Sequence, residues 1–301
     1  MNNSDKIEIQ KTVNKFSSAF NLEVKELAII LAAGHGKRLK SDKSKMLHTI
    51  LGVPTLERVY NACKEAVPAI NIVIVVGIKA VDVMEAMGKR KNTIYAYQEV
   101  QHGTGHAVQV AIEGLKNIPD DAIVYILPGD MGLIDSETIK QFRAQFIKSK
   151  SDMIELTGMF EGKTEENYYG RIIRAKDKAG NVIQIMEHKD ILALPDGQPY
   201  KVQYKDEEYS FSKDELLSNN EYNSGVFAFR YKKLVETIGE LKTENVQNEI
   251  YLTDLISIFN KKGYSVAAMA AEKNYVVMGF NTQEVLQEMN EIAKKVNNVS
   301  K

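Results

Sequence analysis

A glycine-rich loop followed by two cations is the first part of the sequence whose residue types suit chemistry. Leu31–Arg38, which reads LAAGHGKR, directly follows an apolar run, and Lys45 comes after a short polar stretch. Because glycine lets the backbone approach a ligand closely, successive N–H groups in such a loop can cradle phosphate oxygens. A guanidinium fork and an ammonium suit the charge of a triphosphate. The pattern predicts phosphate contacts for Arg38 and Lys45; a tight turn and a solvated charged loop are the structural alternatives.

Two familiar nucleotide motifs do not fit this loop. Leu39 stands where the dinucleotide fingerprint G-x-G-x-x-G needs its third glycine. A Walker A loop needs Ser or Thr after its Gly-Lys pair, whereas Arg38 follows Gly36-Lys37 here. The loop therefore favours a phosphate site of another kind.

Gln98–Ala107, which reads QEVQHGTGHA, is the second unusual stretch. A glutamine amide at a strand end can read the edge of a base, because it donates and accepts hydrogen bonds in fixed geometry. Gly103 and Gly105 permit close backbone contact beside the base or the ribose. His106 falls in the first turn of the helix that follows, where packing or capping explains it better than catalysis does.

Two oxygen donors near other strand ends are candidates for a metal site. Asp130, in Leu-Pro-Gly-Asp, suits Mg²⁺, which takes one or two protein oxygens and completes its shell with phosphates and waters. An aspartate that stabilises a turn explains the residue equally well. Asn281 follows a strand-like run and opens a helix, so it is either the second ligand or a helix N-cap.

These residues need strand ends to carry them, and the first half of the chain alternates strands with helices. We expect strands at Leu27–Ala33, Asn71–Val76, Thr93–Gln98 and Ala122–Leu127, and helices at Thr55–Ala66, Val81–Met87, Thr104–Leu115 and Ser136–Lys150, the last with Ser136 as its N-cap. The alternation predicts βαβ units and a mostly parallel α/β sheet. The first strands are continuously apolar, as strands covered on both faces should be. In such sheets ligands bind at the carboxyl ends of the strands, where the candidate residues lie.

Beyond residue 150 the pattern becomes richer in strands. We expect strands at Met153–Met159, Arg171–Ala175, Asn181–Glu187, Gly225–Phe229, Tyr264–Ala270 and Tyr275–Gly279, and helices at Tyr231–Ile238, Tyr251–Lys261 and from Thr282 onward. Leu192–Asn220 is polar and has no sustained period, so we interpret it as an excursion or flap rather than core. Near the N-terminus, Ile9, Val13, Phe16 and Phe20 share one helical face, which predicts packing on the same domain or, as the alternative, docking of a partner.

The composition is that of a globular enzyme. Of the 301 residues 44% are hydrophobic and 26% are charged, which suits one large α/β domain or two modest ones. The formal net charge of -1 gives no case for a nucleic-acid or anionic-membrane partner. The single cysteine, Cys63, excludes internal disulfides, so we expect a cytoplasmic protein. The polar N-terminus and the short apolar runs predict neither a signal peptide nor a membrane span.

Several motifs occur in one order along the chain. They are Leu31–His48, Gln98–Ala107, Pro128–Asp130, Tyr169–Arg171, Glu187–Asp190, Asn223–Gly225, Tyr251–Asp254 and Gly279–Asn281. The series resembles the uridylyltransferase domain of bacterial bifunctional N-acetylglucosamine-1-phosphate uridylyltransferases, over nearly the whole chain. The resemblance implies a Rossmann-like, mostly parallel sheet of the glycosyltransferase-A-like type with a smaller, β-rich sugar-binding part. It also implies that UTP and N-acetylglucosamine 1-phosphate react, with Mg²⁺ as cofactor, to give pyrophosphate and UDP-N-acetylglucosamine, a cell-envelope precursor.

The resemblance also implies roles for individual residues. By it, the uridine is held by Ala32, Ala33, Gly34, Gln98, Gly103 and Thr104. Arg38 and Lys45 hold the phosphates, Asp130 and Asn281 share the Mg²⁺, and Arg38, Lys45 and Asp130 are the catalytic residues. The amino sugar and its N-acetyl group contact Gly170, Glu187, Asn223, Tyr251 and Thr253.

The domain organisation follows from the same comparison. Residues 1–24 are predicted to form an amphipathic N-terminal extension, and residues 25–301 to form the nucleotidyltransferase domain. Within it, 25–150 is the predicted nucleotide-binding half, 151–280 the sugar-binding half and 281–301 a C-terminal helix.

Departures from the family keep alternatives open. Lys37 adds a positive charge where the family's Gly-x-Gly-Thr-Arg loop has threonine, and the segment between Asp190 and Asn223 is longer than the family's. The longer segment keeps open another sugar 1-phosphate, such as glucose, galactose or an unusual amino sugar. Since no hexapeptide repeat of a left-handed β-helix is found, we expect no acetyltransferase activity, and any oligomer would not form through β-helix trimerisation.

Two further classes of function are weaker alternatives. A catalytically silent sugar-nucleotide sensor would not need the metal pair of Asp130 and Asn281. A phosphocholine or cytidylyl-transferring relative fits the Gln98 segment less well. The sequence therefore favours an enzyme with small-molecule substrates.

Overall fold

Four parallel strands, buried on both faces, make the centre of the structure. The computed structural model describes residues 3–178 and 180–299. β1 (Glu26–Ala32) lies between β4 (Asn71–Val76) and β6 (Ile123–Pro128), and β5 (Thr93–Tyr97) extends the sheet beyond β4. Alternate residues of these strands enter two different cores, which accounts for runs without a polar position. The α/β class and the mostly parallel sheet expected from the sequence are confirmed.

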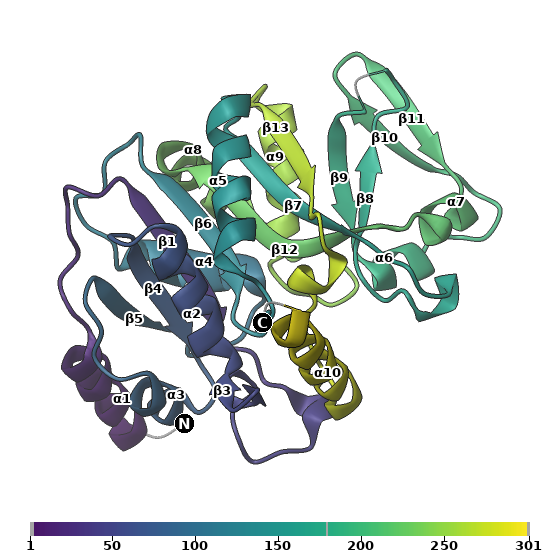
Figure 1. The fold of residues 1–301 in the computed structure, drawn as a ribbon. Coiled ribbons are helices and arrows are strands. Elements are labelled where there is room, and N and C mark those ends of the chain that lie inside the picture. Colours follow the sequence, from purple (N-terminus) through teal and green to yellow (C-terminus); the bar gives the residue numbers. More distant parts are fainter. Residues whose placement is uncertain (1–2, 179, 300–301) are drawn as a thin grey trace.

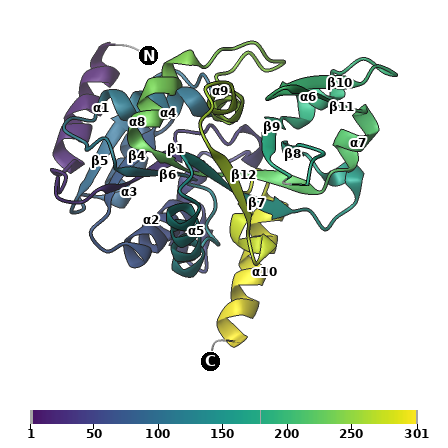
Figure 2. The same ribbon diagram turned by 90° about the horizontal axis from the view of Figure 1, so that it is seen from above.

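Helices cover both faces of this sheet, as Figure 1 and Figure 2 show. One face carries α2 (Thr55–Ala66), α3 (Ala80–Met87) and α5 (Ser136–Ser149); the other carries α4 (Thr104–Glu113), α8 (Tyr231–Thr237) and α9 (Leu255–Lys261). Each helix buries one apolar stripe, because residues three or four positions apart share a helix face. The amphipathic spacing in the sequence therefore determines which face of each helix packs against the sheet.

An antiparallel strand connects the parallel strands to the second half of the chain. β12 (Glu221–Arg230) pairs with β6 and with β7 (Met153–Met159), and β13 (Val266–Ala270) runs parallel to β7 at the edge. The register of β12 shifts between Asn223 and Val226, where Gly225 has a φ of 81°. A bulge of this kind bends a strand. On the amino-terminal side of the bulge, β12 still pairs with β7 and also pairs with β8 (Arg171–Arg174), to which β9 (Val182–Met186) is added.

A smaller lobe is built on β8 and β9 (Figure 1). It contains α6 (His188–Leu192), β10 (Tyr200–Tyr204), β11 (Glu207–Phe211) and α7 (Lys213–Ser218). Ile191, Tyr209, Phe211 and Leu216 are buried together in its own core. The interpretation of Leu192–Asn220 as a flap rather than core is therefore wrong. Apolar and polar residues alternate along its hairpin, β10–β11. Because the polar residues on the exposed face make the segment polar as a whole, its buried apolar face was not recognised.

The two ends of the chain pack on opposite sides of the loops that follow β1. α1 (Asn3–Phe16) lies against α3 and β5 and buries Ile9, which confirms that this helix packs on its own domain. It ends at Phe16, so Phe20 lies beyond it. α10 (Gln283–Val299) buries Leu286 and Met289 near the short hairpin of β2 (Thr49–Ile50) and β3 (Val53–Pro54).

Several local predictions are corrected by the structure. Asp135, not Ser136, caps α5, because its side chain accepts a hydrogen bond from the Thr138 N–H at 2.8 Å. Tyr275–Gly279 is not a strand; most of it belongs to a 3-10 helix, η6 (Asn274–Val277). The helix expected at Tyr251–Lys261 starts as the 3-10 turn η5 (Leu252–Asp254). Other 3-10 turns are η1 (Lys37–Leu39), η2 (Lys45–Leu47), η3 (Thr164–Glu166) and η4 (Ile238–Glu240).

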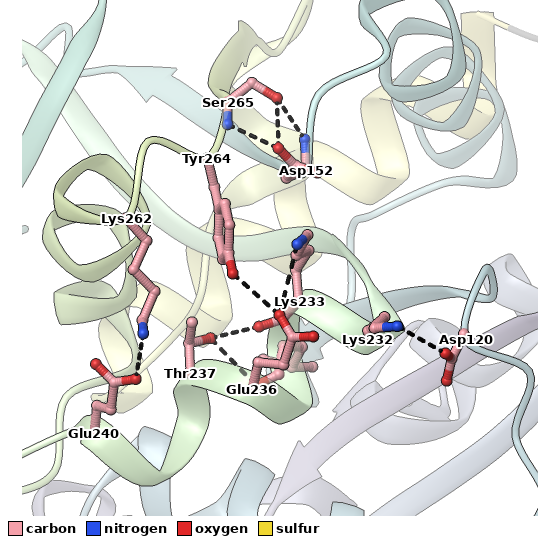
Figure 3. A network of polar contacts seen from close by, with 11 residues as sticks. Asp120, Asp152, Lys232, Lys233, Glu236, Thr237, Glu240, Lys262, Tyr264 and Ser265 are labelled. Carbon is pink, nitrogen blue, oxygen red and sulfur yellow. Dashed lines mark hydrogen bonds and ion pairs between the residues drawn. The ribbon is translucent and has the colours of Figure 1, made fainter.

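A polar network ties α8 to the amino ends of β7 and β13 (Figure 3). The Asp152 carboxylate accepts hydrogen bonds from the backbone and hydroxyl of Ser265 at 2.8 and 2.9 Å, and the Tyr264 hydroxyl donates to Glu236 at 3.1 Å. This edge is opposite to the carboxyl ends of β1 and β6, so the network supports the fold rather than a ligand site.

The central sheet takes strands from both sides of residue 150, and the proposed division of the chain at that point stays a prediction. Within the described ranges, no helix combines the length and the apolar character that a membrane crossing requires.

Candidate active site

The loops that follow β1, β5 and β6 meet at the carboxyl edge of the sheet. The Gly129 N–H donates to the Leu31 carbonyl at 2.9 Å, which holds the turn after β6 against the loop after β1. A Cβ built on Gly129 would lie 3.0 Å from that same carbonyl, so a side chain there would push the two loops apart. Ala32 and Ala33 are buried beside this contact, and Gly34 is exposed. The structure therefore brings together the first and third stretches singled out in the sequence.

Lys45 joins the two candidate metal ligands. Its Nζ lies 2.5 Å from Asp130 Oδ2 and donates to Asn281 Oδ1 at 2.8 Å. The Lys45 and Asp130 side chains are only 9% and 14% exposed, so water screens this ion pair weakly. The Phe280 ring centroid lies 5.4 Å from the same ammonium. Residues from three distant segments thus meet at one nitrogen atom.

The oxygens around Lys45 fit a magnesium site. Asp130 Oδ2 and Asn281 Oδ1 are hard donors that face one point, and Mg²⁺ is usually held by one or two such oxygens together with substrate phosphates. A Cβ built on Gly279 would lie 3.2 Å from Asp130 Oδ2, so a glycine leaves room for that carboxylate. Among the described residues no set of three or more His, Cys, Asp or Glu side chains is arranged to hold a metal alone. The donor set therefore suits an ion that is completed by substrate.

Arg38 lies on η1 with its side chain exposed, and no acidic residue in the described ranges forms an ion pair with it. The turn that leads to it needs Gly36, whose φ is 61° and whose built Cβ would lie 2.9 Å from the Lys45 Cβ. Gly36 thus holds the loop close to Lys45 and leaves the Arg38 guanidinium free for an anion. The side chain of Lys37 lies outside the described part of the structure.

The predicted base-reading residue is held inside the protein. Gln98 is 2% exposed, and its amide nitrogen donates to the Gly103 carbonyl at 3.2 Å and lies 3.1 Å from His106 Nδ1. The amide nitrogen therefore fixes the turn that ends at Gly103. His106 takes part in the same contact, which agrees with the packing role expected for it.

The Gly103 turn is fastened to the second half of the chain. Gly103 has a φ of 106°, and a Cβ built on it would lie 2.6 Å from the Ile250 carbonyl. The same carbonyl accepts from the Gly105 N–H at 2.8 Å, and Thr104 Oγ1 accepts from the Leu252 N–H at 3.2 Å. Thr104 and Tyr251 therefore belong to one continuous wall, although they lie far apart in the sequence.

The predicted sugar-binding residues gather near the amino-terminal end of β12, where this strand pairs with β8. The Asn223 N–H donates to the Gly170 carbonyl at 2.9 Å. A Cβ built on Gly170 would lie 3.1 Å from both carboxylate oxygens of Glu187. Tyr251 and Thr253 are 7% and 5% exposed. The structure brings these residues together around one carboxylate.

Glu187 has an unusual electrostatic setting. Burial raises the pKa of Glu187 to about 7, and the charges of Asp190, Asp254 and Glu249 add to this shift. Burial and the charge of Asp190 raise the pKa of Asp254 to about 6. Carboxyls that titrate near neutral pH are common at ligand sites. Glu187 can therefore change its protonation state under working conditions.

Tyr169 lies next to the site, although no role of its own was predicted for it from the sequence. Its ring stacks on Tyr222 with centroids 4.3 Å apart, and Tyr222 lies beside Asn223. Burial raises the pKa of Tyr169, and the charge of Asp130 adds to the effect. Tyr169 thus lies between the Asp130 end and the Glu187 end of the site. Only its place next to Gly170 in a motif pointed to it.

Comparisons with known proteins find relatives that match most of this chain. Residues 28–162 match the model of the MobA-like NTP transferase domain. The bifunctional protein GlmU of Acetivibrio thermocellus is 37% identical over 268 residues, and the match covers 89% of this chain and 51% of that protein. GlmU of Caldicellulosiruptor saccharolyticus is 34% identical, with 86% and 50% covered. The chain spans about half the length of the curated relatives it matches.

A solved structure shares the fold at low sequence identity. A UDP-glucose pyrophosphorylase in complex with UDP-glucose has a TM-score of 0.60 and 16% identity, covering 90% of this chain and 98% of that one. At this identity the likeness concerns the fold. The chain is therefore similar to the bifunctional GlmU proteins over about half of their length, and its residues 28–162 match the MobA-like NTP transferase domain.

Proposed function

We propose that this chain is a magnesium-dependent uridylyltransferase that forms UDP-N-acetylglucosamine and pyrophosphate from UTP and N-acetylglucosamine 1-phosphate. The observation that carries the proposal is the meeting of Lys45, Asp130 and Asn281 within hydrogen-bond distance. In this proposal the phosphates of the two substrates meet at these three side chains, with Arg38 on the nucleotide side and Glu187 on the sugar side. The identity of 37% to a GlmU protein supports the same choice of substrates.

Asp130 and Asn281 would hold the Mg²⁺ in this proposal. The ion, when bound, supplies charge that offsets the repulsion between the two phosphate groups. Lys45 and Arg38 bind the phosphates and neutralise negative charge on the α-phosphate and on the leaving group. The loop of Ala32, Ala33 and Gly34, with Gln98, Gly103 and Thr104, encloses the uridine. These residues act by positioning and by charge, without a covalent intermediate.

The reaction proposed is an in-line displacement at phosphorus. An oxygen of the sugar 1-phosphate attacks the α-phosphorus of UTP, a new P–O bond forms, and the bond to the β-phosphate oxygen breaks as pyrophosphate leaves. Gly170, Glu187, Asn223, Tyr251 and Thr253 would hold the sugar and its N-acetyl group. Because Gly170 has no side chain, the Glu187 carboxylate can lie close to its backbone, since a Cβ there would come within 3.1 Å of both carboxylate oxygens.

The test is pyrophosphate release with UTP, dTTP, CTP or ATP against the 1-phosphates of N-acetylglucosamine, N-acetylgalactosamine and glucose. Rapid turnover that needs Mg²⁺ and is confined to UTP with N-acetylglucosamine 1-phosphate is the expected result, and EDTA should abolish it. Turnover with UTP and another sugar 1-phosphate would support the proposed reaction but not the proposed sugar. The lobe that contains β10 and β11 would then be the part to examine for sugar specificity. Tight binding of a sugar nucleotide without turnover for any pair would refute the proposal.

A further inference from the structure

Lys79 lies between β4 and α3 in a backbone conformation that lysine rarely adopts. Its φ is 55° and its ψ is 39°, which is the left-handed region, and its side chain is exposed. Glycine takes this conformation without the steric conflict that a Cβ meets. Backbone strain persists where the surroundings over-determine it, and it clusters at functional sites. The presence of a lysine, rather than a glycine, is therefore the feature that needs an explanation.

The Lys79 ammonium reaches the predicted phosphate loop. Its Nζ donates a hydrogen bond to the backbone carbonyl of Asp42, which lies between Arg38 and Lys45 in the chain. Two residues before Lys79, Gly77 packs on the loop that follows β1, since a Cβ built on Gly77 would lie 2.8 Å from the Ala33 Cβ. The β4–α3 connection therefore forms one side of the loop that carries Arg38.

Among the described residues, the charge of Lys79 has no anionic partner. Within the ranges that the structure describes, no carboxylate forms an ion pair with Lys79 or with Arg38. A neutral carbonyl is a weaker acceptor for an ammonium than an ionised phosphate oxygen is. The Asp42 carbonyl therefore keeps the Lys79 ammonium beside the loop without neutralising it.

We propose that Lys79 is a third cation of the phosphate site, which binds the β- and γ-phosphates of the nucleotide and so the pyrophosphate that leaves. This inference rests on the proposed function for the identity of the ligand. On binding, the Lys79 Nζ exchanges the Asp42 carbonyl for a phosphate oxygen. A lysine suits this role because its ammonium is a compact charge on a long, flexible stem.

The chain offers a matched control in Lys150. It is also an exposed lysine in the left-handed region, with a φ of 54°, but it ends α5 at the opposite edge of the sheet. Lys79→Gly and Lys150→Gly relieve the same kind of strain, so any effect common to both comes from the backbone. Lys79→Met removes the charge and keeps the strain, which separates the two contributions.

The experiment measures equilibrium binding by titration calorimetry, with UMP, Mg²⁺–UTP and inorganic pyrophosphate as probes. Lys79→Gly and Lys79→Met should weaken the binding of UTP and pyrophosphate by about tenfold, the range of one charge-assisted contact, and leave UMP unchanged. Lys150→Gly should bind all three probes as the wild-type protein does. The affinity of the Lys79 variants should also depend less on salt concentration.

Two results would overturn this assignment. If UMP weakened as much as UTP, Lys79 would only brace the loop, and if no probe weakened, it would have no role in binding. The readout does not require turnover, so the two proposals fail separately. Wild-type protein that binds UTP and pyrophosphate but releases no pyrophosphate would refute the uridylyltransferase, while the Lys79 comparison would still stand or fall on its own.

Discussion

Lys45 contacts two oxygen donors, one from the turn that follows β6 and one from the segment just before α10. Its contacts to Asp130 at 2.5 Å and Asn281 at 2.8 Å lie in a mostly buried setting, where charge interactions are stronger than at the surface. Removing the Asp130 charge leaves the ammonium with a neutral partner. The same change removes the only carboxylate that contacts Lys45 in the described ranges. Asp130 is therefore the residue at which the proposed metal site is most sensitive.

Asp130→Asn should lower the rate of pyrophosphate release by about a hundredfold or more, because a charged ligand at the reacting phosphates is lost while the side-chain shape is kept. The measurement is the initial rate at saturating substrates over a range of Mg²⁺ concentrations. Asp121→Asn is the matched control, since Asp121 is exposed and pairs with Lys25 at 2.7 Å away from the site. A rate for Asp130→Asn within a few-fold of the control would remove Asp130 from the metal site.

Glu187 should make sugar binding depend on pH. Its pKa is raised to about 7 by burial and by neighbouring carboxylates, so it changes from mostly protonated to mostly ionised between pH 6 and pH 8. An ionised carboxylate accepts hydrogen bonds from sugar hydroxyl and amide groups, whereas the protonated form has less capacity to accept. The KM for the sugar 1-phosphate should therefore fall by about tenfold over this range relative to the Glu187→Gln variant, because the ionised fraction rises by that factor.

The comparison with Glu187→Gln also cancels the titration of the substrate phosphate. A variant whose KM follows the wild-type pH profile would show that Glu187 does not titrate in the site.

The raised pKa of Glu187 also makes the stability of the folded protein depend on pH. Because the pKa of Glu187 is higher in the folded state, its contribution to stability is present below the unfolded value of about 4.3 and is lost as the pH rises through about 7.

Among the helices and strands, the sequence predicts bounds best where the hydrophobic period and the flanking residues point to the same element. The buried strand Asn71–Val76 and the helix Thr55–Ala66 were predicted with their observed bounds, because a continuous apolar run and an amphipathic stripe each have one simple solution. The N-cap of α5 was missed because Asp135 and Ser136 are both good caps, and only the bond to Thr138 decides between them. The β10–β11 hairpin was missed because five-residue strands with an exposed polar face carry little signal.

Part of the candidate site could be predicted from the sequence because of the topology of the sheet. Parallel strands end at the same edge, so Gly34 and Asp130 could be expected near one another. The convergence of Asn281 on Lys45 depends on how α10 packs, which no local pattern encodes. The inward turn of the Gln98 amide depends on the Gly103 carbonyl and His106 in the folded loop. The order of strands and motifs in the sequence therefore predicted the sheet edge at which the site lies, whereas the contacts of Asn281 and Gln98 depend on tertiary packing.

Gly103 should be required for the contact between the turn before α4 and Ile250, which lies just before η5. Gly103→Ala would place a Cβ 2.6 Å from the Ile250 carbonyl at a φ of 106°, so the two segments must separate. We expect a loss of about 1–3 kcal/mol in the free energy of unfolding and weaker binding of both substrates. Urea unfolding and the two KM values provide the measurement.

Gly88→Ala separates the clash from the backbone strain. Gly88 also has a positive φ, 65°, with an extended ψ like that of Gly103, but no atom lies within 4 Å of its built Cβ. The Ala variant at Gly88 should therefore lose stability without a change in either KM. If the two variants had equal effects on substrate binding, the contact with Ile250 would not be what holds the two walls of the site together.

At the scale of the whole molecule, one continuous sheet connects the two proposed substrate walls. β12 runs from the central strands, past the bulge at Gly225, to the strand pair that carries Gly170 and Glu187. A polar row lies along this junction: Thr157 donates to Glu221 at 2.9 Å, and Arg174 binds both oxygens of Glu221 at 2.7 Å. Glu155 is two residues before Thr157 on β7, hence on the same face of the sheet. The junction between the walls therefore contains a carboxyl that the proposed reaction does not use.

Glu155 should limit the stability of the molecule at neutral and alkaline pH. Its side chain is fully buried, and neither carboxyl oxygen has a hydrogen-bond partner among the described residues. Burial raises its pKa well above the ordinary value, and the charge of Glu221 adds to this while Arg174 opposes it. Because the folded-state pKa is the higher one, its contribution to stability is present below the unfolded value of about 4.3 and is lost as the pH rises through the folded pKa.

Glu155→Gln and Glu155→Leu should both remove this loss. Neither side chain ionises, so each variant should gain stability over the wild-type protein as the pH rises from about 5 to 9, by about 1–3 kcal/mol at the upper end. Leucine should be the more stable of the two, since a buried amide without partners is also costly. Urea unfolding at several pH values measures the difference, with the exposed Glu240→Gln as control. A wild-type stability that ran parallel to both variants across this pH range would show that Glu155 keeps the same protonation state folded and unfolded, and that the junction tolerates its charge.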